Sequence, residues 1–343
     1  MIAVSQKSGC TAFFGEILIR LTVPGKQLLA QAGSLDLHFV GAEANVAIGL
    51  ASLGAATRMI SVVPNTALGR RAKSVLQAAG VDCSRLHEAS GRMGLYYLTP
   101  GAGQRSSEII YDRTGSCFAL AREGDFDWDA AFEGCDRLHI SGVNPALGAE
   151  NAQLALSVIK AAKARGLIIS FDGNYRASLW ASWKSDPRAI LSELVSYADI
   201  FFGNHRDVAL LLDVDLGKVD GESRRRAAAV AAFEAFTNLK YIASTARHVE
   251  AADVNRISAR IDTPTDSAQT DEVVLSGIVD RIGAGDAFAA GILHGLDANK
   301  GLDHTAQQGL ALACLKHTVP GDASLFTQGD IDAFLSGELD VRR

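Results

Sequence analysis

The sequence predicts an α/β protein in which helices cover both faces of a mainly parallel sheet, with a small β-sheet lid attached. Two observations support this class. Short runs that are apolar throughout alternate with longer amphipathic stretches, which is typical of buried parallel strands connected by helices. One pair of strand-like runs has no helix between its members. The alternation predicts the main sheet, and the exception predicts the lid.

The elements of the main sheet follow one another along the chain. A strand over 58–63 precedes a helix over 66–79 that ends at Gly80, and a helix over 151–165 ends at Gly166, because glycine commonly follows the last turn of a helix. Such strands require right-handed crossovers and place a binding site at their carboxyl ends. Further strands are predicted over 137–140, 167–171, 199–202 and 241–244.

The lid is predicted from a hairpin. Strand-like runs over 95–98 and 108–111 are separated by the turn-rich stretch Pro100–Gly103, which leaves no room for a helix. Strand-like residues near 35–39 could join this hairpin in a small sheet. We therefore expect the lid strands to lie within 16–40 and 94–118.

No linker, repeat or low-complexity segment divides the chain, so a single domain over 10–338 is expected. The 343 residues carry a net charge of −6, which argues against a nucleic-acid partner. The cationic cluster Arg224–Arg226 is interpreted as the solvated start of a helix rather than a binding patch.

The protein is expected to be soluble and cytoplasmic. Its five cysteines are scattered and form no Cys-x-x-Cys pair, so neither a zinc site nor a disulfide framework is indicated. No uninterrupted apolar run reaches the roughly 18 residues of a membrane helix. Residues 1–20 lack the layout of a signal peptide because Glu16 and Arg20 interrupt the apolar part.

The stretch Asp280–Asp286 carries the clearest chemistry. Glycines flank an alanine, an aspartate follows, and the next residues have helical periodicity. A glycine turn that opens a helix presents unpaired N–H groups to a phosphate. Asp286 would repel that anion, unless it takes a proton from a hydroxyl while the N–H groups hold a transferred phosphoryl group. Alternatively, Asp286 simply caps the helix. The motif alone leaves both interpretations open.

Two other phosphate-binding motifs do not fit. A dinucleotide-binding Gly-x-Gly-x-x-Gly motif fails because Phe288 stands where the third glycine is needed. A Walker-type loop fails because no Gly-Lys-Ser/Thr follows.

Several segments resemble the PfkB (ribokinase-like) carbohydrate kinases. Asp280–Asp286 is similar to the family's Asp-Thr-x-Gly-Ala-Gly-Asp signature, and Gly41–Ala47 with Leu53-Gly54 is similar to its N-terminal sugar-binding segment. The matches keep their order and span roughly 14–322. Further segments resemble the 2-keto-3-deoxygluconate kinase branch, namely 91–97, 101–105, 110–113, 170–176 and 317–322.

The resemblance implies a ribokinase-like fold and transfer of the ATP γ-phosphoryl group to the 6-hydroxyl of 2-keto-3-deoxygluconate or a close keto-deoxy sugar acid. Asp286 would be the general base, and the backbone N–H groups of Gly283, Ala284 and Gly285 the anion hole. Mg²⁺ is expected as the ATP complex, without a dedicated metal site in the protein.

The resemblance also assigns binding residues. Arg113 and Arg176 would recognise the sugar carboxylate, since an arginine fork binds a carboxylate with two hydrogen bonds. The full substrate set is Gly41, Asn45, Tyr96, Tyr111, Arg113, Arg176 and Asp322. The nucleotide set is Asn174, Arg176, Asn204, Thr245, Arg247, Gly283 and Gly285.

The chain departs from the family pattern at three places. Arg281 replaces the signature threonine, and Asp207 replaces the glutamate of the Asn-x-x-Glu element that begins at Asn204. Residues 244–248 replace the usual glycine-containing nucleotide loop. These departures leave the contacts to the nucleotide base unassigned.

Two alternative functions remain open. One is a neutral-sugar kinase such as a fructokinase, against which the two arginines argue. The other is a sugar-sensing protein on the same fold without catalysis, against which Asp286 argues. The edge strands of the lid often pair between subunits, so a homodimer formed through the lid is expected.

Overall fold

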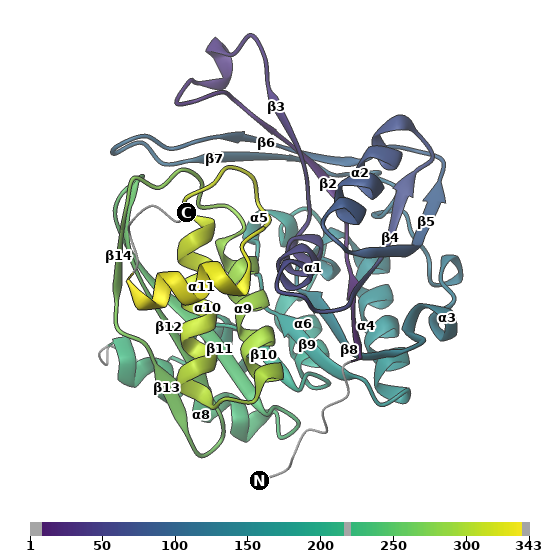
Figure 1. The fold of residues 1–343 in the computed structure, drawn as a ribbon. Helices are drawn as coiled ribbons and strands as arrows, with labels where there is room; N and C mark the ends of the chain where they lie inside the picture. Colours follow the sequence, from purple (N-terminus) through teal and green to yellow (C-terminus); the bar gives the residue numbers. More distant parts are fainter. Residues whose placement is uncertain (1–8, 216–220, 338–343) are drawn as a thin grey trace.

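The computed structural model describes residues 9–215 and 221–337, so position 338, the predicted end of the domain, lies outside the described residues. Most strands form one ten-stranded sheet in the order β13-β12-β11-β10-β9-β8-β1-β4-β5, with β14 also paired to β12 (Figure 1). The strands are β1 Cys10–Phe14, β4 Thr57–Pro64, β5 Asp82–Ala89, β8 Cys135–Ser141, β9 Ile168–Asp172, β10 Ile200–Phe202, β11 Tyr241–Ala251, β12 Val254–Asp262, β13 Ser267–Gln269 and β14 Val273–Ser276.

The sheet is parallel from β11 to β5 and antiparallel where β12, β13 and β14 extend it. The predicted mainly parallel sheet is therefore confirmed. The predicted strand over 241–244 is much longer than expected, since β11 continues to Ala251 and pairs with β12 along its length.

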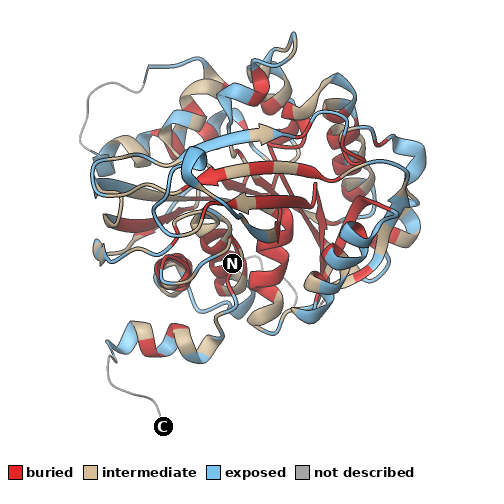
Figure 2. Cartoon of the chain, turned by 90° about the horizontal axis from the view of Figure 1, so that it is seen from above, coloured by how far each residue is buried: buried red, intermediate tan, exposed pale blue. Residues whose placement is uncertain are grey.

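Helices cover both faces of this sheet. One buried apolar cluster includes residues of α4, α6 and α8, and a second includes residues of α1, α2, α9 and α10. Figure 2 shows the buried residues in the central strands and inner helices, with exposed residues on the outer helices and loops. The helices are α1 Ala42–Ser52, α2 Ala67–Ala78, α3 Trp128–Phe132, α4 Ala149–Ala164, α5 Ala177–Trp180, α6 Pro187–Val195, α7 His205–Leu212, α8 Gly221–Ala235, α9 Ala284–Ala298, α10 Leu302–Lys316 and α11 Gln328–Ser336, with 3₁₀ turns η1 Leu29–Gln31, η2 Glu123–Asp125 and η3 Pro145–Leu147.

Local signals end the helices where the sequence predicts. The Thr66 hydroxyl caps α2 by accepting from the Gly69 N–H at 3.4 Å. Gly80 and Gly166 follow α2 and α4 with φ of +89° and +77°, a left-handed conformation that glycine adopts without steric cost. The predicted boundaries of both helices are thus confirmed to within two residues.

The lid is a separate four-stranded sheet with the order β3-β2-β6-β7, which crosses the top of the view in Figure 1. Strands β6 and β7 form the predicted antiparallel hairpin, and β2 pairs in parallel with β6. All four strands fall within the predicted ranges 16–40 and 94–118. They are β2 Leu18–Thr22, β3 Asp36–Val40, β6 Gly94–Thr99 and β7 Glu108–Asp112.

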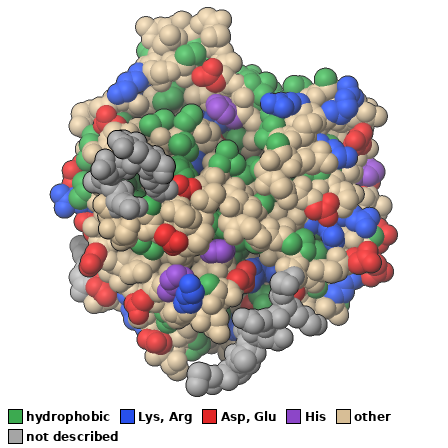
Figure 3. All heavy atoms as spheres, viewed as in Figure 1, with side chains coloured by type: hydrophobic (Ala, Val, Ile, Leu, Met, Phe, Trp, Pro, Cys, Tyr) green, Lys and Arg blue, Asp and Glu red, His purple; other side chains and the backbone are tan. Residues whose placement is uncertain are grey.

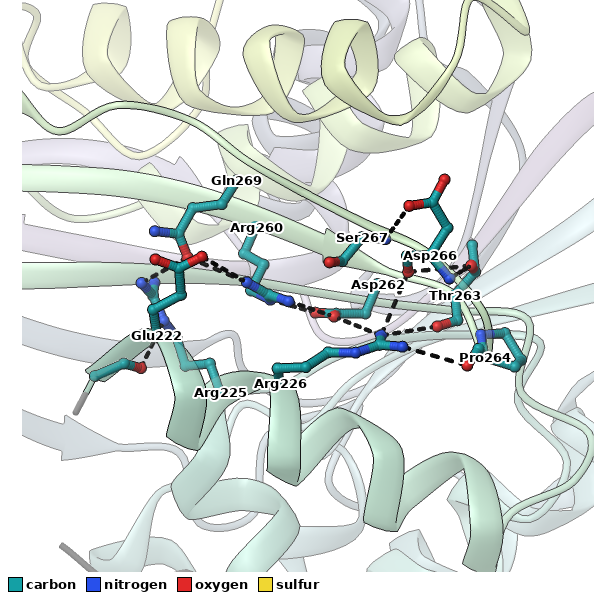
Figure 4. Close-up of polar contacts among 11 residues, drawn as sticks. Glu222, Arg225, Arg226, Arg260, Asp262, Thr263, Pro264, Asp266, Ser267 and Gln269 are labelled. Atoms are coloured by element: carbon teal, nitrogen blue, oxygen red, sulfur yellow. Dashed lines mark hydrogen bonds and ion pairs between the residues drawn. The ribbon is translucent and has the colours of Figure 1, made fainter. Parts of the chain in front are cut away.

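The arginine cluster lies at the start of helix α8, as predicted, but Arg225 and Arg226 are not simply solvated, so that part of the prediction is wrong. Arg226 Nη1 donates to Asp262 Oδ1 at 2.9 Å, and Arg225 Nη2 donates to Gln269 Oε1 at 2.9 Å (Figure 4). The buried Arg260 completes the network by donating to Asp262 Oδ2 at 2.8 Å. The partners lie 36 and 44 residues further along the chain. The cluster therefore attaches α8 to the β12–β13 edge of the sheet.

Within the residues that the structure describes, no helix is long and apolar enough to cross a membrane. On the face shown in Figure 3, basic side chains are scattered among acidic ones and do not form a broad basic stripe.

Candidate active site

The turn before α9 is shaped by glycine. Gly283 is the N-cap residue with φ of +79°, and a Cβ there would lie 1.8 Å from the carbonyl oxygen of Asp322. A Cβ on Gly285 would meet nothing within 4 Å, so space is open beside the first turn of α9. The Ala284 N–H donates over 3.4 Å to Arg281 O, whereas the N–H groups of the next two residues have no acceptor within the helix. The turn offers N–H groups to an anion.

Asp286 is the third residue of α9, not its N-cap, so the capping interpretation is wrong. Its Oδ2 instead accepts from Asn45 Nδ2 of α1 at 2.7 Å, which joins segments 241 residues apart. Burial raises the pKa of Asp286 to about 8, and the carboxylates of Asp172 and Asp322 reinforce the shift. A carboxylate with a pKa near neutral is suited to general base catalysis.

A second group of carboxylates lies at the carboxyl ends of β9 and β10. Asp172 ends β9, and Asp207 lies in the first turn of α7, which follows β10. Burial raises the pKa of Asp172 to about 7, with a further contribution from Asp207. The charge of Arg176, at the N-cap of α5, opposes the shifts of Asp172, Asp207 and Asp286 alike. The charge of Arg176 therefore acts on all three carboxylates.

Two of the predicted nucleotide residues have clear local roles. Asn204 caps α7, since its Oδ1 accepts from the Arg206 N–H at 2.8 Å, and the Asn204 N–H donates to Asp207 Oδ2 at 2.8 Å. Asn174 follows β9 with φ of +36°, and its N–H donates to Asp172 Oδ1 at 3.1 Å. The backbone N–H groups of Asn174 and Asn204 thus bind the carboxylates of Asp172 and Asp207.

Residues 244–248 lie within β11 rather than in a loop. Thr245 and Arg247 are therefore held by pairing with β12. Partial desolvation and the nearby charge of Arg281 lower the pKa of Arg247. Arg247 and Arg281 thus place two positive charges near the turn that opens α9.

Tyr96 and Asp322 meet in a buried network that contains Arg20, which no sequence motif indicates as a site residue. Tyr96 Oη donates to Asp322 Oδ2 at 2.5 Å, and the Tyr111 ring lies 6.0 Å from the Tyr96 ring. Arg20 of β2 is ion-paired with Asp322, and its Nη2 lies 2.6 Å from Asp280 Oδ2. The sequence feature that could have indicated Arg20 is its position as an arginine within the largely apolar run Leu18–Thr22.

Arg113 is paired with Glu16 inside the protein. Its Nε and Nη2 lie 2.8 and 2.6 Å from Glu16 Oε2, and the residue is only 6% exposed. Neighbouring glycines make room for this pair, because a Cβ on Gly94 would lie 2.3 Å from Glu16 Oε1, and one on Gly41 2.3 Å from Glu16 O. Of the two predicted arginines, Arg176 is the exposed one.

The described residues contain no group of three or more histidine, cysteine, aspartate or glutamate side chains placed to hold a metal ion. The site instead contains the carboxylates of Asp172, Asp207 and Asp286, on which the charge of Arg176 acts.

The fold and this arrangement are those of an α/β phosphotransferase. A profile of the pfkB family carbohydrate kinases matches residues 11–246 and 262–328. The chain belongs to this family, and it is a carbohydrate kinase.

Several relatives of this family resemble the chain over nearly its whole length. The 2-dehydro-3-deoxygalactonokinase of Haloferax volcanii is 29% identical over 94% of this chain and 96% of its own. The 2-dehydro-3-deoxygluconokinase of Bacillus subtilis is 28% identical over 96% of each. The structure of the 2-dehydro-3-deoxygluconokinase of Thermotoga maritima has 31% identity and a TM-score of 0.91, and covers 96% of this chain and 100% of that one.

Proposed function

We propose that the protein phosphorylates the 6-hydroxyl of 2-keto-3-deoxygluconate (2-dehydro-3-deoxygluconate) or a close keto-deoxy sugar acid, with ATP as the phosphoryl donor. The names of the relatives support this substrate class. The observation that carries the proposal is the position of Asp286, in the first turn of α9 beside open space, with Asn45 bound to its carboxylate and the charge of Arg176 acting on it.

In the proposed reaction, Asp286 accepts the proton of the sugar 6-hydroxyl as that oxygen forms a bond to the γ-phosphorus. The bond from the γ-phosphorus to the β–γ bridging oxygen breaks, and ADP leaves. The N–H group of Gly285, which has no acceptor within the helix, is proposed to hold the charge on the transferred group together with those of Gly283 and Ala284, the Ala284 N–H exchanging its long hydrogen bond to Arg281 O for a phosphoryl oxygen. A water-poor site makes these contacts more effective. Asn45 holds the Asp286 carboxylate in place for the proton transfer.

The sugar acid is proposed to bind under the lid. Arg176 is exposed and supplies the carboxylate contact. Arg113 is held by Glu16, and Asp322 is held by Arg20 and in turn accepts from Tyr96, so these side chains give the pocket a fixed shape. Gly41, Asn45 and Tyr111 complete the proposed sugar site.

The nucleotide is proposed to lie along the carboxyl ends of β9, β10 and β11. Asn174, Asn204, Thr245 and Arg247 are proposed to contact it, with Gly283 and Gly285 at the phosphates. The two carboxylates Asp172 and Asp207 fit Mg²⁺ that arrives with ATP, since Mg²⁺ keeps several waters and needs one or two carboxylates, and these two would hold it. When bound, the ion would neutralise phosphate charge.

Arg176→Ala is expected to raise KM for the sugar acid by about tenfold or more, because a charge-assisted contact to the carboxylate is lost. Steady-state kinetics on a sugar acid will measure this effect. Arg188→Ala is the control, because Arg188 is exposed and pairs with Asp213 on the surface. An unchanged KM in Arg176→Ala would show that the carboxylate binds elsewhere.

The function itself is tested by coupled ADP release with ATP across keto-deoxy sugar acids and neutral hexoses. Turnover of the acids alone is expected. Preference for fructose would establish the fructokinase alternative, and sugar binding without ADP release would establish a sensor. Either result would refute the proposed function.

We further propose that the single kinase domain dimerises through its lid. Leu37 of β3 and Ile110 of β7 are 47% and 46% exposed on the two outer strands of the lid. We expect light scattering to give the mass of a dimer, and Ile110→Glu to give the mass of a monomer. A monomeric wild type would contradict this proposal.

A further inference from the structure

Beneath the turn that opens α9 lies the ammonium group of Lys316, which the proposed reaction does not use. Lys316 is the last residue of α10 and is 0% exposed. Its Nζ donates to the carbonyl oxygens of Asp280 and Val319, at 3.2 and 3.3 Å. Burying a charged ammonium is costly unless it is hydrogen-bonded and compensated by opposite charge. The complete burial of the Lys316 ammonium therefore implies that it has a structural or functional role.

The two carbonyl groups belong to the two segments that shape the turn. Asp280 comes directly before the turn, and its carboxylate accepts from the N–H groups of Ile282 and Gly321 at 3.0 and 3.1 Å. Val319 begins the segment that leads to Asp322, whose carbonyl oxygen lies against Gly283. The ammonium of Lys316 thus donates hydrogen bonds to both segments that shape the turn.

Lys316 and Arg20 are the cations that offset the two carboxylates buried behind the turn. Asp280 and Asp322 are two buried negative groups, and Arg20 is paired with both. Lys316 supplies the second positive charge. Burial lowers the pKa of Lys316, and the carboxylates of Asp280 and Asp322 oppose that shift. Without Lys316, the two buried carboxylates would have Arg20 as their shared buried cation, and the excess negative charge behind the N–H groups would weaken their hold on a phosphoryl group.

We propose that Lys316 is an internal cation that fixes the anion-binding turn and cancels the charge behind it, so that it supports phosphoryl transfer without touching either substrate. This role rests on the proposed function. Lys316 is a positioning residue, and its loss should reduce kcat much more than it changes KM for the sugar acid.

The test compares Lys316→Gln with the wild type and with Lys163→Met. Glutamine retains a hydrogen-bond donor but has no charge. Lys163 pairs with Asp199 at the opposite end of the sheet, so Lys163→Met controls for the loss of a partly buried lysine. We expect Lys316→Gln to lower kcat by about tenfold or more, with KM for the sugar acid nearly unchanged, and Lys163→Met to keep wild-type kcat. If Lys316→Gln does not fold, Lys316→Met is measured by the same criteria.

Chemical rescue separates a cation from a packing role. Lys316→Ala removes the equivalent of propylammonium, so added propylammonium should restore turnover, and tetramethylammonium, which has no N–H donor, should not. Equal restoration by both would show a salt effect and overturn the proposal. Wild-type kcat in folded Lys316→Gln, or a loss confined to KM, would also overturn it. An inactive wild type would instead refute the proposed function.

Discussion

Asp286→Asn is expected to lower kcat by about 10²- to 10⁴-fold while the fold is retained, because the general base is lost and its hydrogen bond with Asn45 can still form. Coupled ADP release measures the loss, and circular dichroism checks the fold. Asp303→Asn is the matched control, since Asp303 is an exposed carboxylate in the first turn of the neighbouring helix α10. Near wild-type turnover in Asp286→Asn would remove the assignment of the base.

The same carboxylate predicts a pH dependence. Because burial raises its pKa to about 8, Asp286 is largely protonated in the free protein below that pH, and kcat/KM should rise with pH up to about 8. The raised pKa also means that ionisation of Asp286 opposes folding. The thermal stability of Asp286→Asn relative to wild type should therefore increase as pH rises from about 4 to about 8. A stability difference independent of pH would show that the carboxylate is not desolvated.

Arg20→Met is expected to destabilise the protein by roughly 3–5 kcal/mol, because Asp280 and Asp322 would stay buried without their shared partner. Burial alone would lower the pKa of Arg20, but the two carboxylates outweigh it and raise that pKa. Urea denaturation followed by circular dichroism will measure the change.

The control for Arg20→Met is Arg92→Met near the base of the lid. Arg92 pairs with Asp112, and both side chains are at least 40% exposed. Exposed pairs contribute about 0–1 kcal/mol, so this change should be small. Equal effects of the two substitutions would contradict the network.

The parallel sheet and the lid hairpin could be predicted because their signals are local. An apolar run such as 167–171 and a turn such as Pro100–Gly103 specify structure within a few residues. The antiparallel extension by β12–β14 was missed. Its strand β12 includes the buried polar residues Asn255 and Arg260, which interrupt the apolar pattern expected of an interior strand.

The candidate site was predictable as a set of motifs but not as a set of contacts. The sequence cannot show that Asn45 reaches Asp286, or that Arg113 is already paired with Glu16, because these partners are 241 and 97 residues apart. The same limit explains the error at Arg224–Arg226. A run of arginines has the same sequence pattern whether water or a distant carboxylate compensates its charge.

The ion pairs of the lid restrict how it can move. Arg20 and Tyr96, on the neighbouring strands β2 and β6, are both held by Asp322, and Arg113, directly after β7, is held by Glu16. Rotation of the whole lid about its base would break these buried contacts together. We therefore expect closure over a sugar to occur by bending of the outer parts of β6 and β7, with the hinge within the strands rather than at their base.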